Sequence, residues 1–342
     1  MSVLHLLGTA GEGGAETYFV DLVRALAQHG VSQACAIRPN PTRQAALQGA
    51  GVAVEPLPFG GLLDPLTKAR AAAFARRQGT RVALAWMNRA ARHTPAGPWA
   101  RIGRLGGYYK LKYYRGFDHL VANTEDIADW VVGQGWPAGK VSYIPNFAAA
   151  PPDAAPVARA SLDTPEGVPL LLSMGRLHDA KAHDVTLQAL TEVPDAWLWV
   201  AGAGPLEDKL KSLAHGLGVH NRVRFLGWRT DASALYRAAD LCVFPSRYEP
   251  LGNVVIQAWA HGLPVVAAAS KGPASLIRDG DDGLLVPIDD APALAAAIRR
   301  ALAEPLLRAG LAHRGQARVE GQFSPAAVVG AWRTLFADHG LS

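Results

Sequence analysis

Two series of short apolar segments, each alternating with amphipathic segments, constrain the fold of this 342-residue chain more than any other feature. Runs such as residues 3–7 and 197–201 have the length and composition of strands that are buried on both faces. Segments such as residues 16–29 and 291–303 have the periodicity of helices. Repeated alternation of strand and helix predicts parallel sheets that are covered by helices.

The two series can be written as ranges. In the first, strands are predicted at 3–7, 33–37, 52–57, 82–86, 119–122 and 141–144, with a helix at 16–29. In the second, strands are predicted at 169–173, 197–201, 222–226, 241–244, 264–268 and 283–286, and helices at 183–190, 206–216, 232–239, 254–261 and 291–303. The Gly-rich turns fall at strand ends, where ligands bind in such sheets.

A small, Pro-rich segment, residues 148–156, separates the two series. The chain is too long for one ordinary core, so we predict an α/β protein with two doubly wound, Rossmann-like domains that face a cleft. The predicted boundaries are 1–150 and 151–323, followed by a terminal helical segment, 324–342. Its Trp332 and Phe336 are four residues apart and share a helix face, which we expect to pack on the N-terminal domain.

Composition limits the compartment and the partners. Cys35 and Cys242 lie in apolar runs, so buried thiols in a reducing compartment are expected rather than a disulfide. No signal peptide and no apolar run long enough to span a membrane is recognised, so a cytoplasmic protein with at most peripheral membrane contact is expected. Between Asp64 and Asp118 there are 12 basic and no acidic residues, whereas the net charge is only +5, which predicts an anionic partner.

The segment 249–257, EPLGNVVIQ, carries the clearest chemical signal. Glu249 follows a predicted strand, a turn with Pro250 and Gly252 comes next, and a helix then carries Gln257. Glu249 can accept hydrogen bonds from hydroxyls, while the turn and the helix N-terminus can direct N–H groups at an anion. Together these groups suit a ligand that is part sugar and part phosphate.

Four further turns could contribute to binding. Arg176 and Lys181 follow a strand and could converge on a diphosphate, or could be two solvated cations. The turns containing Gly13 and Gly14, and Gly202 and Gly204, allow a ligand close to the backbone, or serve helix packing. Arg229 lies in a turn that could flank a base, or one in which Asp231 caps the next helix.

Taken in order, these segments resemble the retaining glycosyltransferases of family 4, the glycosyl transferases group 1, which have the GT-B fold. The similarity covers nearly the whole chain and rests on GGAE at 13–16, GRLHDAK at 175–181, GAGPL at 202–206, PSRYEPLG at 245–252 and HGLPVVA at 261–267. It implies sugar transfer from a nucleotide-sugar, most simply a UDP-sugar, with retained anomeric configuration. It implies no cofactor and no metal.

The resemblance also implies roles for residues. Arg176 and Lys181 would bind the diphosphate and Glu249 the donor sugar, as the catalytic set. Gln257 stands where the family has a second acid that accepts from the ribose, which leaves the identity of the donor open. The full donor-binding set is Gly13, Gly14, Gly202, Gly204, Arg229, Gln257 and the amides of Leu251, Gly252 and Asn253.

On the acceptor side, many relatives have a His after the strand that here reads VALAW. This chain has Met87, Asn88 and Arg89 at that point, so Asn88 and Arg89 become the acceptor-side candidates, with His93 as a weaker one. A lone His near a loop is more often structural. Glu16, in the GGAE motif, belongs to the same set.

The segment 99–115 interleaves cations with aromatic residues. Such a pattern suits a membrane interface or an anionic glycolipid, single-stranded nucleic acid, or a helix whose tyrosines pack inward. The resemblance favours a lipid-linked or lipopolysaccharide-type glycan acceptor at the inner membrane face, and no nucleic-acid partner. The residues expected to face the membrane or the anionic acceptor are Arg101, Arg104, Lys110, Lys112 and Arg115.

Two other functions fit the same motifs. One is a sugar-nucleotide epimerase or a phosphorylase of the same fold. The other is a catalytically silent partner subunit that binds a nucleotide, which the Gln at position 257 would permit.

Overall fold

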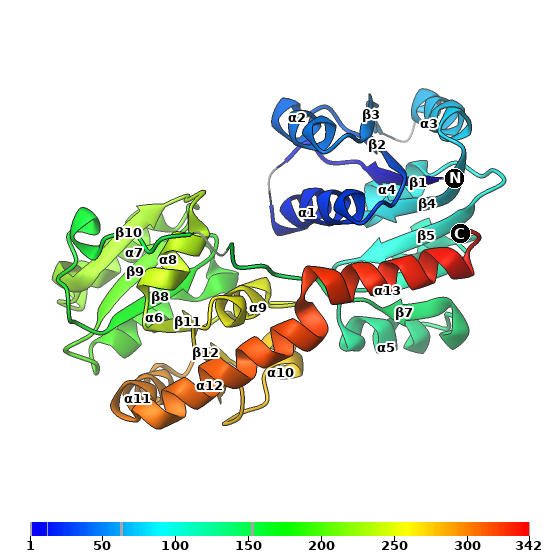
Figure 1. Ribbon diagram of the computed structural model, residues 1–342. Coiled ribbons are helices and arrows are strands. Elements are labelled where there is room, and N and C mark those ends of the chain that lie inside the picture. Colours follow the sequence, from blue (N-terminus) through cyan, green and yellow to red (C-terminus); the bar gives the residue numbers. More distant parts are fainter. Residues whose placement is uncertain (1, 12, 62–63, 152–153, 342) are drawn as a thin grey trace. The chain divides into compact units, whose positions relative to one another are not determined.

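The computed structural model describes residues 2–11, 13–61, 64–151 and 154–341 and divides them into two units (Figure 1). Unit 1 comprises Met1–Asn146 and Pro325–Ser342, and unit 2 comprises Phe147–Ser324. Each unit has its own parallel sheet, with helices connecting successive strands. The prediction of two doubly wound, Rossmann-like domains is therefore confirmed.

Unit 1 contains a seven-stranded sheet in the order β3-β2-β1-β4-β5-β6-β7. All of its strand pairs are parallel. Its strands are β1 (Ser2–Leu7), β2 (Gln33–Ile37), β3 (Ala53–Pro56), β4 (Thr80–Trp86), β5 (Ala100–Leu105), β6 (His119–Ala122) and β7 (Val141–Tyr143). Its helices are α1 (Gly14–Gln28), α2 (Pro41–Gly49), α3 (Pro65–Arg77), α4 (Met87–His93), α5 (Glu125–Gly133) and α13 (Pro325–Asp338), with short helices η1 (Leu111–Tyr114) and η2 (Ala138–Lys140).

Unit 2 contains a six-stranded parallel sheet in the order β10-β9-β8-β11-β12-β13. Its strands are β8 (Leu170–Met174), β9 (Trp197–Ala201), β10 (Val223–Gly227), β11 (Leu241–Phe244), β12 (Val265–Ala268) and β13 (Leu284–Val286). Its helices are α6 (His183–Leu190), α7 (Glu207–Gly216), α8 (Ala232–Ala238), α9 (Asn253–Ala260), α10 (Lys271–Leu276), α11 (Ala291–Ala303) and α12 (Pro305–Arg318), with short helices η3 (Arg159–Leu162), η4 (Asp179–Lys181), η5 (His220–Arg222) and η6 (Val319–Phe323).

The strand order in each unit places the candidate site residues. In both sheets the order reverses between two neighbouring strands, β1 and β4 in unit 1 and β8 and β11 in unit 2. Ligands of open parallel sheets bind beyond the carboxyl ends of the strands at such a reversal. The segments that contain Gly13 and Gly14, Asn88 and Arg89, Arg176 and Lys181, and Glu249 follow these four strands, whereas the turns of Gly202 and Gly204 and of Arg229 follow β9 and β10.

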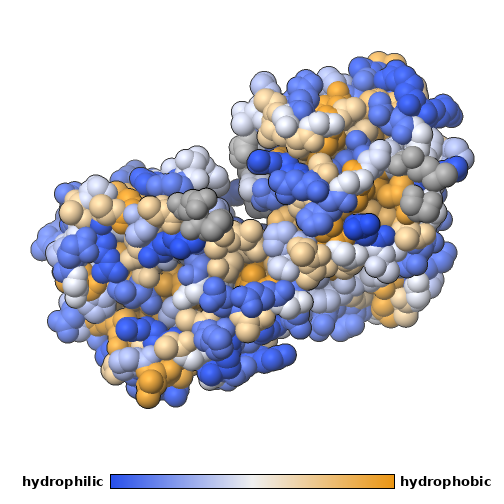
Figure 2. Space-filling model, in the orientation of Figure 1, coloured by the Kyte–Doolittle hydropathy of each residue, from blue (hydrophilic) through white to orange (hydrophobic). Residues whose placement is uncertain are grey.

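Each sheet is buried on both faces, as its continuous apolar strands require. In β8, Leu171 belongs to one apolar cluster, while Leu170 and Leu172 belong to the cluster on the other side of the sheet. Side chains of successive residues in a strand point to opposite faces, so both faces need apolar residues. On the surface, Figure 2 shows apolar residues scattered among hydrophilic ones on the face in view.

The terminal helix α13 belongs to unit 1 and contacts α1 (Figure 1). The prediction that Trp332 and Phe336 share a packing face is confirmed, because both rings are fully buried and their centroids are 5.4 Å apart. The prediction that Cys35 and Cys242 are buried thiols is also confirmed. Burial raises the pKa of the Cys242 thiol to about 12.

Strand β5 was not predicted. Its sequence, Ala100–Leu105, carries Arg101 and Arg104, which interrupt the apolar pattern that marks the other strands. Arg104 is nevertheless buried, because its guanidinium lies over the rings of Tyr18 and Trp86 at 4.9 and 4.7 Å. Its pKa is lowered by burial, and it donates a hydrogen bond to Asn146 Oδ1. Aromatic stacking thus allows a charged residue in the middle of a sheet.

The turns after β8 and β9 pack directly on each other through glycines. A Cβ atom at Gly202 would lie 1.9 Å from the carbonyl oxygen of Gly175, and Gly202 has φ +153°. A Cβ atom at Gly204 would lie 2.4 Å from the carbonyl oxygen of Leu177. Contacts this close leave room only for glycine at both positions.

Substitution Gly202→Ala is expected to lower the thermal midpoint, because the added methyl group overlaps the Gly175 carbonyl and the backbone angle is strained. We expect a loss of about 3 kcal/mol or more, the scale of core overpacking with added backbone strain. A matched control is Gly216→Ala at the end of α7, where an added Cβ meets nothing within 4 Å. Equal melting of the two variants by circular dichroism would contradict this packing.

Candidate functional site

An ion pair between Lys181 and Glu249 forms the centre of the candidate site in unit 2. Lys181 ends η4, which follows β8, and Glu249 follows β11, the neighbouring strand. The Lys181 ammonium contacts Glu249 Oε2 and lies 5.3 Å from the centre of the Phe244 ring. The side chains of Lys181 and Glu249 are only 23% and 14% exposed, so the pair is largely shielded from water.

The second carboxylate oxygen of Glu249 is held by its own turn. Its Oε1 accepts from the backbone N–H groups of Leu251 and Gly252 at 3.4 and 3.2 Å. Sequence analysis assigned these two amides to a sugar or a phosphate. In the structure both amides bond to Glu249 instead, at or just beyond the upper end of the usual N–H···O range. Asn253 is the first residue of α9.

The turn that carries Glu249 rests on α10. The backbone N–H of Gly272 donates to the Glu249 carbonyl at 2.8 Å, and a Cβ atom at Gly272 would lie 2.6 Å from the Leu251 carbonyl carbon. Gly252 has φ +90° at the N-cap of α9, the left-handed region that glycine tolerates. The backbone around Glu249 is therefore fixed by close contacts.

Arg247 links the two segments that provide Lys181 and Glu249, and sequence analysis did not identify it. Its guanidinium donates to both oxygens of Asp184 at 3.0 and 2.7 Å, to Asp289 at 2.5 Å and to the carbonyl of Asp179 at 2.9 Å. Burial is the largest single influence on Asp184 and opposes its ionisation, but the hydrogen bonds and charge of Arg247, together with backbone N–H groups, outweigh it and lower the pKa of this carboxyl. The cation within PSRYEPLG was the signal that could have revealed it.

The two other candidate cations of unit 2, Arg176 and Arg229, differ in whether they are free to bind an anion. Arg176 is exposed and makes no hydrogen bond or ion pair with the described residues, so its guanidinium is free for an anion. Arg229 is paired with Asp231 through two bonds of 2.8 and 2.5 Å. Asp231 occupies the N-cap position of α8 but makes no capping hydrogen bond, so the capping interpretation was wrong.

Gln257 lies on the exposed side of α9, and its amide orientation is set by a neighbour. Its Oε1 accepts from the Tyr236 hydroxyl at 3.1 Å, and the Tyr236 ring stacks on His261 with centroids 5.0 Å apart. Burial raises the pKa of Tyr236 well above its usual range, so the phenol stays a donor. With one lone pair of the carbonyl oxygen engaged, the Nε2 amide is the group of Gln257 that has both of its hydrogens available to a ligand.

The Gly-rich turn of unit 1 follows β1 and leads into α1. Gly13 is the N-cap of α1 and Gly14 its first residue, with no side-chain cap. Glu16 lies in the first turn, and its Oε2 would be 2.8 Å from a Cβ atom at Gly13. Arg43 donates to the carbonyls of Thr9 and Gly11 at 2.8 and 2.7 Å, which fixes the loop before the helix.

The acceptor-side candidates Asn88 and Arg89 lie in α4, directly after β4. Met87, the first residue of α4, has φ +63°, a strained conformation for a residue with a side chain. Arg89 is exposed and packs against Gly8, where a Cβ atom would lie 2.9 Å from Arg89 Cγ. The amide oxygen of Asn88 is buried without a hydrogen-bond partner in the described residues.

His93 does not join this group. Its ring is 3% exposed, its Nε2 lies 3.2 Å from the Gly60 carbonyl, and it contacts Phe59 edge to face. Burial is the main cause of its lowered pKa. Our acceptor-side assignment of His93 is corrected: the side chain holds the loop after β3.

The basic and aromatic segment also differs from its prediction. The buried Arg104 cannot face a membrane, and Arg101 is half-buried, with its guanidinium bonded to the Gly116 carbonyl and lying 5.5 Å from the Phe117 ring centre. The Tyr114 ring is buried and Tyr108 packs on Trp130. The exposed cations are Lys110, Lys112 and Arg115. Much of the aromatic pattern therefore serves the core.

Neither a metal-binding cluster nor a membrane-spanning helix is present in the described residues. In the ranges that the structure describes, no group of three or more His, Cys, Asp or Glu side chains is placed to hold a metal ion. None of the described helices combines the length and apolarity of a membrane span.

Comparison with known proteins gives matches over nearly the whole chain. A family model described as "Glycosyl transferases group 1" matches residues 168–304, and one described as "Glycosyltransferase Family 4" matches residues 12–148. The lipopolysaccharide core biosynthesis glycosyltransferase LpsE of Rhizobium meliloti (strain 1021) is 40% identical over 96% of each chain. The corresponding LpsD of that organism is 39% identical over 100% of this chain and 99% of its own.

A solved structure has the same fold. The Anabaena protein Alr3699/HepE in complex with UDP superposes with a TM-score of 0.87 over 99% of this chain and 100% of its own, at 21% identity. At this identity the likeness establishes the fold.

Proposed function

This chain belongs to the group 1 glycosyltransferases and has the GT-B fold; from this premise we propose that it transfers a sugar from a UDP-sugar to a lipopolysaccharide-type glycan. Two relatives about 40% identical over their whole length are named for lipopolysaccharide core biosynthesis, which supports the acceptor class. A protein of the same fold binds UDP, which supports the donor class. The transfer retains the anomeric configuration and needs no metal.

The observation that carries this proposal is the pair Lys181 and Glu249 at the strand-order reversal of unit 2. A nucleotide-sugar brings a diphosphate and a polyhydroxyl ring to one place. Lys181 and the unpaired Arg176 supply positive charge for the diphosphate, and Glu249 supplies oxygens that accept hydrogen bonds from the sugar hydroxyls. When the donor binds, the diphosphate replaces Glu249 as the partner of Lys181, and Glu249 turns to sugar hydroxyls.

In the proposed reaction the bond between the anomeric carbon and the diphosphate oxygen breaks, and a bond to the acceptor oxygen forms on the same face. The acceptor proton passes to the departing phosphate oxygen. Negative charge develops on the leaving diphosphate, where Lys181 and Arg176 stabilise it electrostatically without a metal. The described residues contain no second carboxylate beside Glu249 within ion-pairing distance of Lys181, in keeping with a leaving group that serves as the base.

We propose that Gln257, on helix α9, helps to determine which nucleotide-sugar donor is bound. Because the Tyr236 hydroxyl occupies Gln257 Oε1, we propose that Gln257 donates from Nε2 to a ribose oxygen. A carboxylate at this position would accept from the ribose hydroxyls instead. On the acceptor side, Asn88, Arg89 and Glu16 of unit 1 remain the proposed contacts.

The substitution Glu249→Gln is expected to abolish sugar transfer while leaving the fold intact. The Glu249→Gln side chain keeps its size but loses the charge and the acceptor strength, so kcat/KM should fall about 100-fold or more. Product formation from a UDP-sugar and a lipid-free core oligosaccharide measures this loss, and the thermal midpoint reports the fold. Glu166→Gln, an exposed position of unit 2, is the matched control. Wild-type transfer by a folded Glu249→Gln variant would refute the assignment.

Peripheral attachment to the inner membrane face is also proposed, through the three exposed cations Lys110, Lys112 and Arg115. Each cation near an anionic surface contributes about 1 kcal/mol, so the triple Gln variant should lose most of its binding to anionic vesicles at low salt. Co-sedimentation with anionic and neutral vesicles measures it. Gln substitution of Lys209, Arg299 and Arg300, three exposed cations of unit 2, is the control. Equal losses in both variants would reject this surface.

A further inference from the structure

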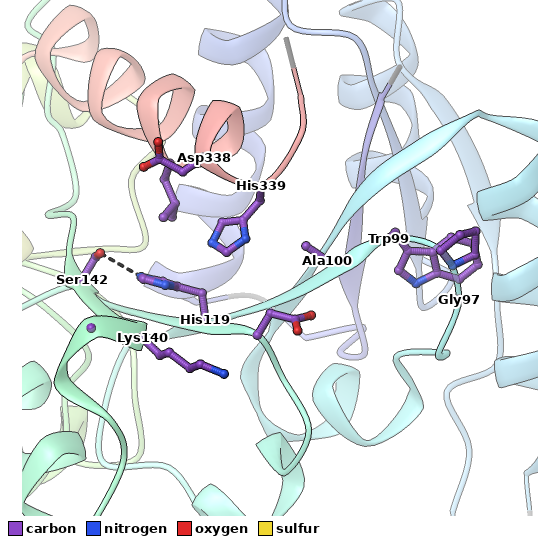
Figure 3. Close-up of a pocket in the computed structure, with 12 residues that line it drawn as sticks. Gly97, Trp99, Ala100, His119, Lys140, Ser142, Asp338 and His339 are labelled. Atoms are coloured by element: carbon purple, nitrogen blue, oxygen red, sulfur yellow. Dashed lines mark hydrogen bonds between the residues drawn. The ribbon is translucent and has the colours of Figure 1, made fainter.

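Unit 1 contains a hollow of about 850 Å³, whose lining residues are drawn in Figure 3. It is formed where β5, β6 and β7 begin, together with the end of α13. The Gly-rich turn and Asn88 and Arg89 follow the ends of β1 and β4. In a parallel sheet the amino ends of all strands lie on one side and the carboxyl ends on the other, so the hollow is separate from the candidate site.

Polar side chains from four segments converge on the hollow. In Figure 3 the rings of His119 and His339 lie next to each other in an edge-on arrangement, with centroids 5.4 Å apart and an interplanar angle of 65°. His119 Nε2 lies 2.8 Å from Ser142 Oγ. The side chains that determine the chemistry of the hollow are Trp99, Asp118, His119, Lys140, Asp338 and His339.

The charges around the hollow disfavour an anionic ligand. Two carboxylates, Asp118 and Asp338, and one ammonium, that of Lys140, line the hollow, and none of the three is in an ion pair with the described residues. Asp118 Oδ2 accepts from the backbone N–H of Arg101 at 2.8 Å, which leaves its other oxygen for a ligand. The C-terminus of α13, a helix of 14 residues, adds a partial negative charge beside Asp338. Phosphate, the group expected at the donor site, would therefore be repelled here.

His119 acts as a neutral hydrogen-bonding group. His119 is 7% exposed, and burial together with His339 lowers its pKa to about 4. At neutral pH its ring therefore carries one donor and one acceptor nitrogen. A metal ion is not favoured, because no group of three ligand side chains was found in the described part of the chain.

Apolar surface completes the lining. Trp99 and Leu335 also line the hollow. A volume of about 850 Å³ is within the range of small-molecule sites. Carboxylates, an ammonium, two imidazoles and apolar surface in one place match a ligand with many hydroxyls and C–H faces and no charge of its own.

We propose that this hollow is a second carbohydrate-binding site, which holds a neutral sugar of a glycan at a distance from the reacting hydroxyl. Asp118 and Asp338 accept from sugar hydroxyls, and Lys140 and the imidazoles donate to sugar oxygens. The choice of a glycan as ligand rests on the proposed glycosyltransferase function. The site itself is independent of the donor pair in unit 2, so the two can be tested separately.

Histidine NMR provides the test, because His119 and His339 report on the hollow directly. The probes are the methyl α-glycosides of glucose, galactose and mannose and their α-linked disaccharides, at millimolar concentrations. We expect saturable shifts of the His119 and His339 ring signals, assigned with His119→Gln and His339→Gln. The signal of His313, on α12 of unit 2, should stay unchanged.

Three variants separate the outcomes. The exposed pair Lys140→Met and Asp338→Asn, combined, should weaken sugar binding at least about tenfold, since it removes charge-assisted hydrogen bonds. Arg333→Met, an exposed change on α13 outside the hollow, should leave binding unaltered. Glu249→Gln should also keep it, whatever happens to transfer. The proposal is overturned if no sugar shifts the two signals, if the double variant binds as the wild type does, or if inorganic phosphate binds more tightly.

Discussion

The candidate site depends on one ion pair, between Lys181 and Glu249, that the surrounding backbone holds in place. A largely buried pair is costly to desolvate, so it persists only where neighbours fix its geometry. Here Arg247 joins the segments after β8 and β11, and glycines at 175, 202 and 272 let the turns pack against each other. We propose that a bound sugar diphosphate replaces the contact within this pair, because an ammonium suits its phosphates and a carboxylate suits its hydroxyls.

Parallel topology explains why separate motifs meet at all. Lys181 and Glu249 are 68 residues apart in sequence, but they follow neighbouring strands of one sheet. The same rule brings the Gly-rich turn of unit 1 close to Arg89, after β1 and β4. At the amino ends of the strands of unit 1, the starts of β5, β6 and β7 and the end of α13 form a hollow with different chemistry. One sheet can thus provide two surfaces of unlike charge.

Most strands could be predicted because they are apolar on both faces. Strand β5 could not, since Arg101 and Arg104 hide its pattern, and burial of Arg104 depends on the rings of Tyr18 and Trp86 and on a hydrogen bond to Asn146. At the candidate site, the order of the sequence motifs predicted Lys181 and Glu249 as site residues, but it did not predict their ion pair. It also did not identify Arg247 as the residue that links their segments. Contacts such as those of His93 with Gly60 and of Gln257 with Tyr236 join residues far apart in sequence, so no local pattern reveals them.

The most direct test of this account compares the binding of UDP and of UDP-sugars by calorimetry in wild type, Lys181→Met and Glu249→Gln. If Lys181 binds the diphosphate and Glu249 binds the sugar, Lys181→Met should weaken both ligands about tenfold or more. Glu249→Gln should weaken only the UDP-sugar. Unchanged affinity of both folded variants for every UDP-sugar that the wild type binds would contradict the assignment of the donor site to this pair.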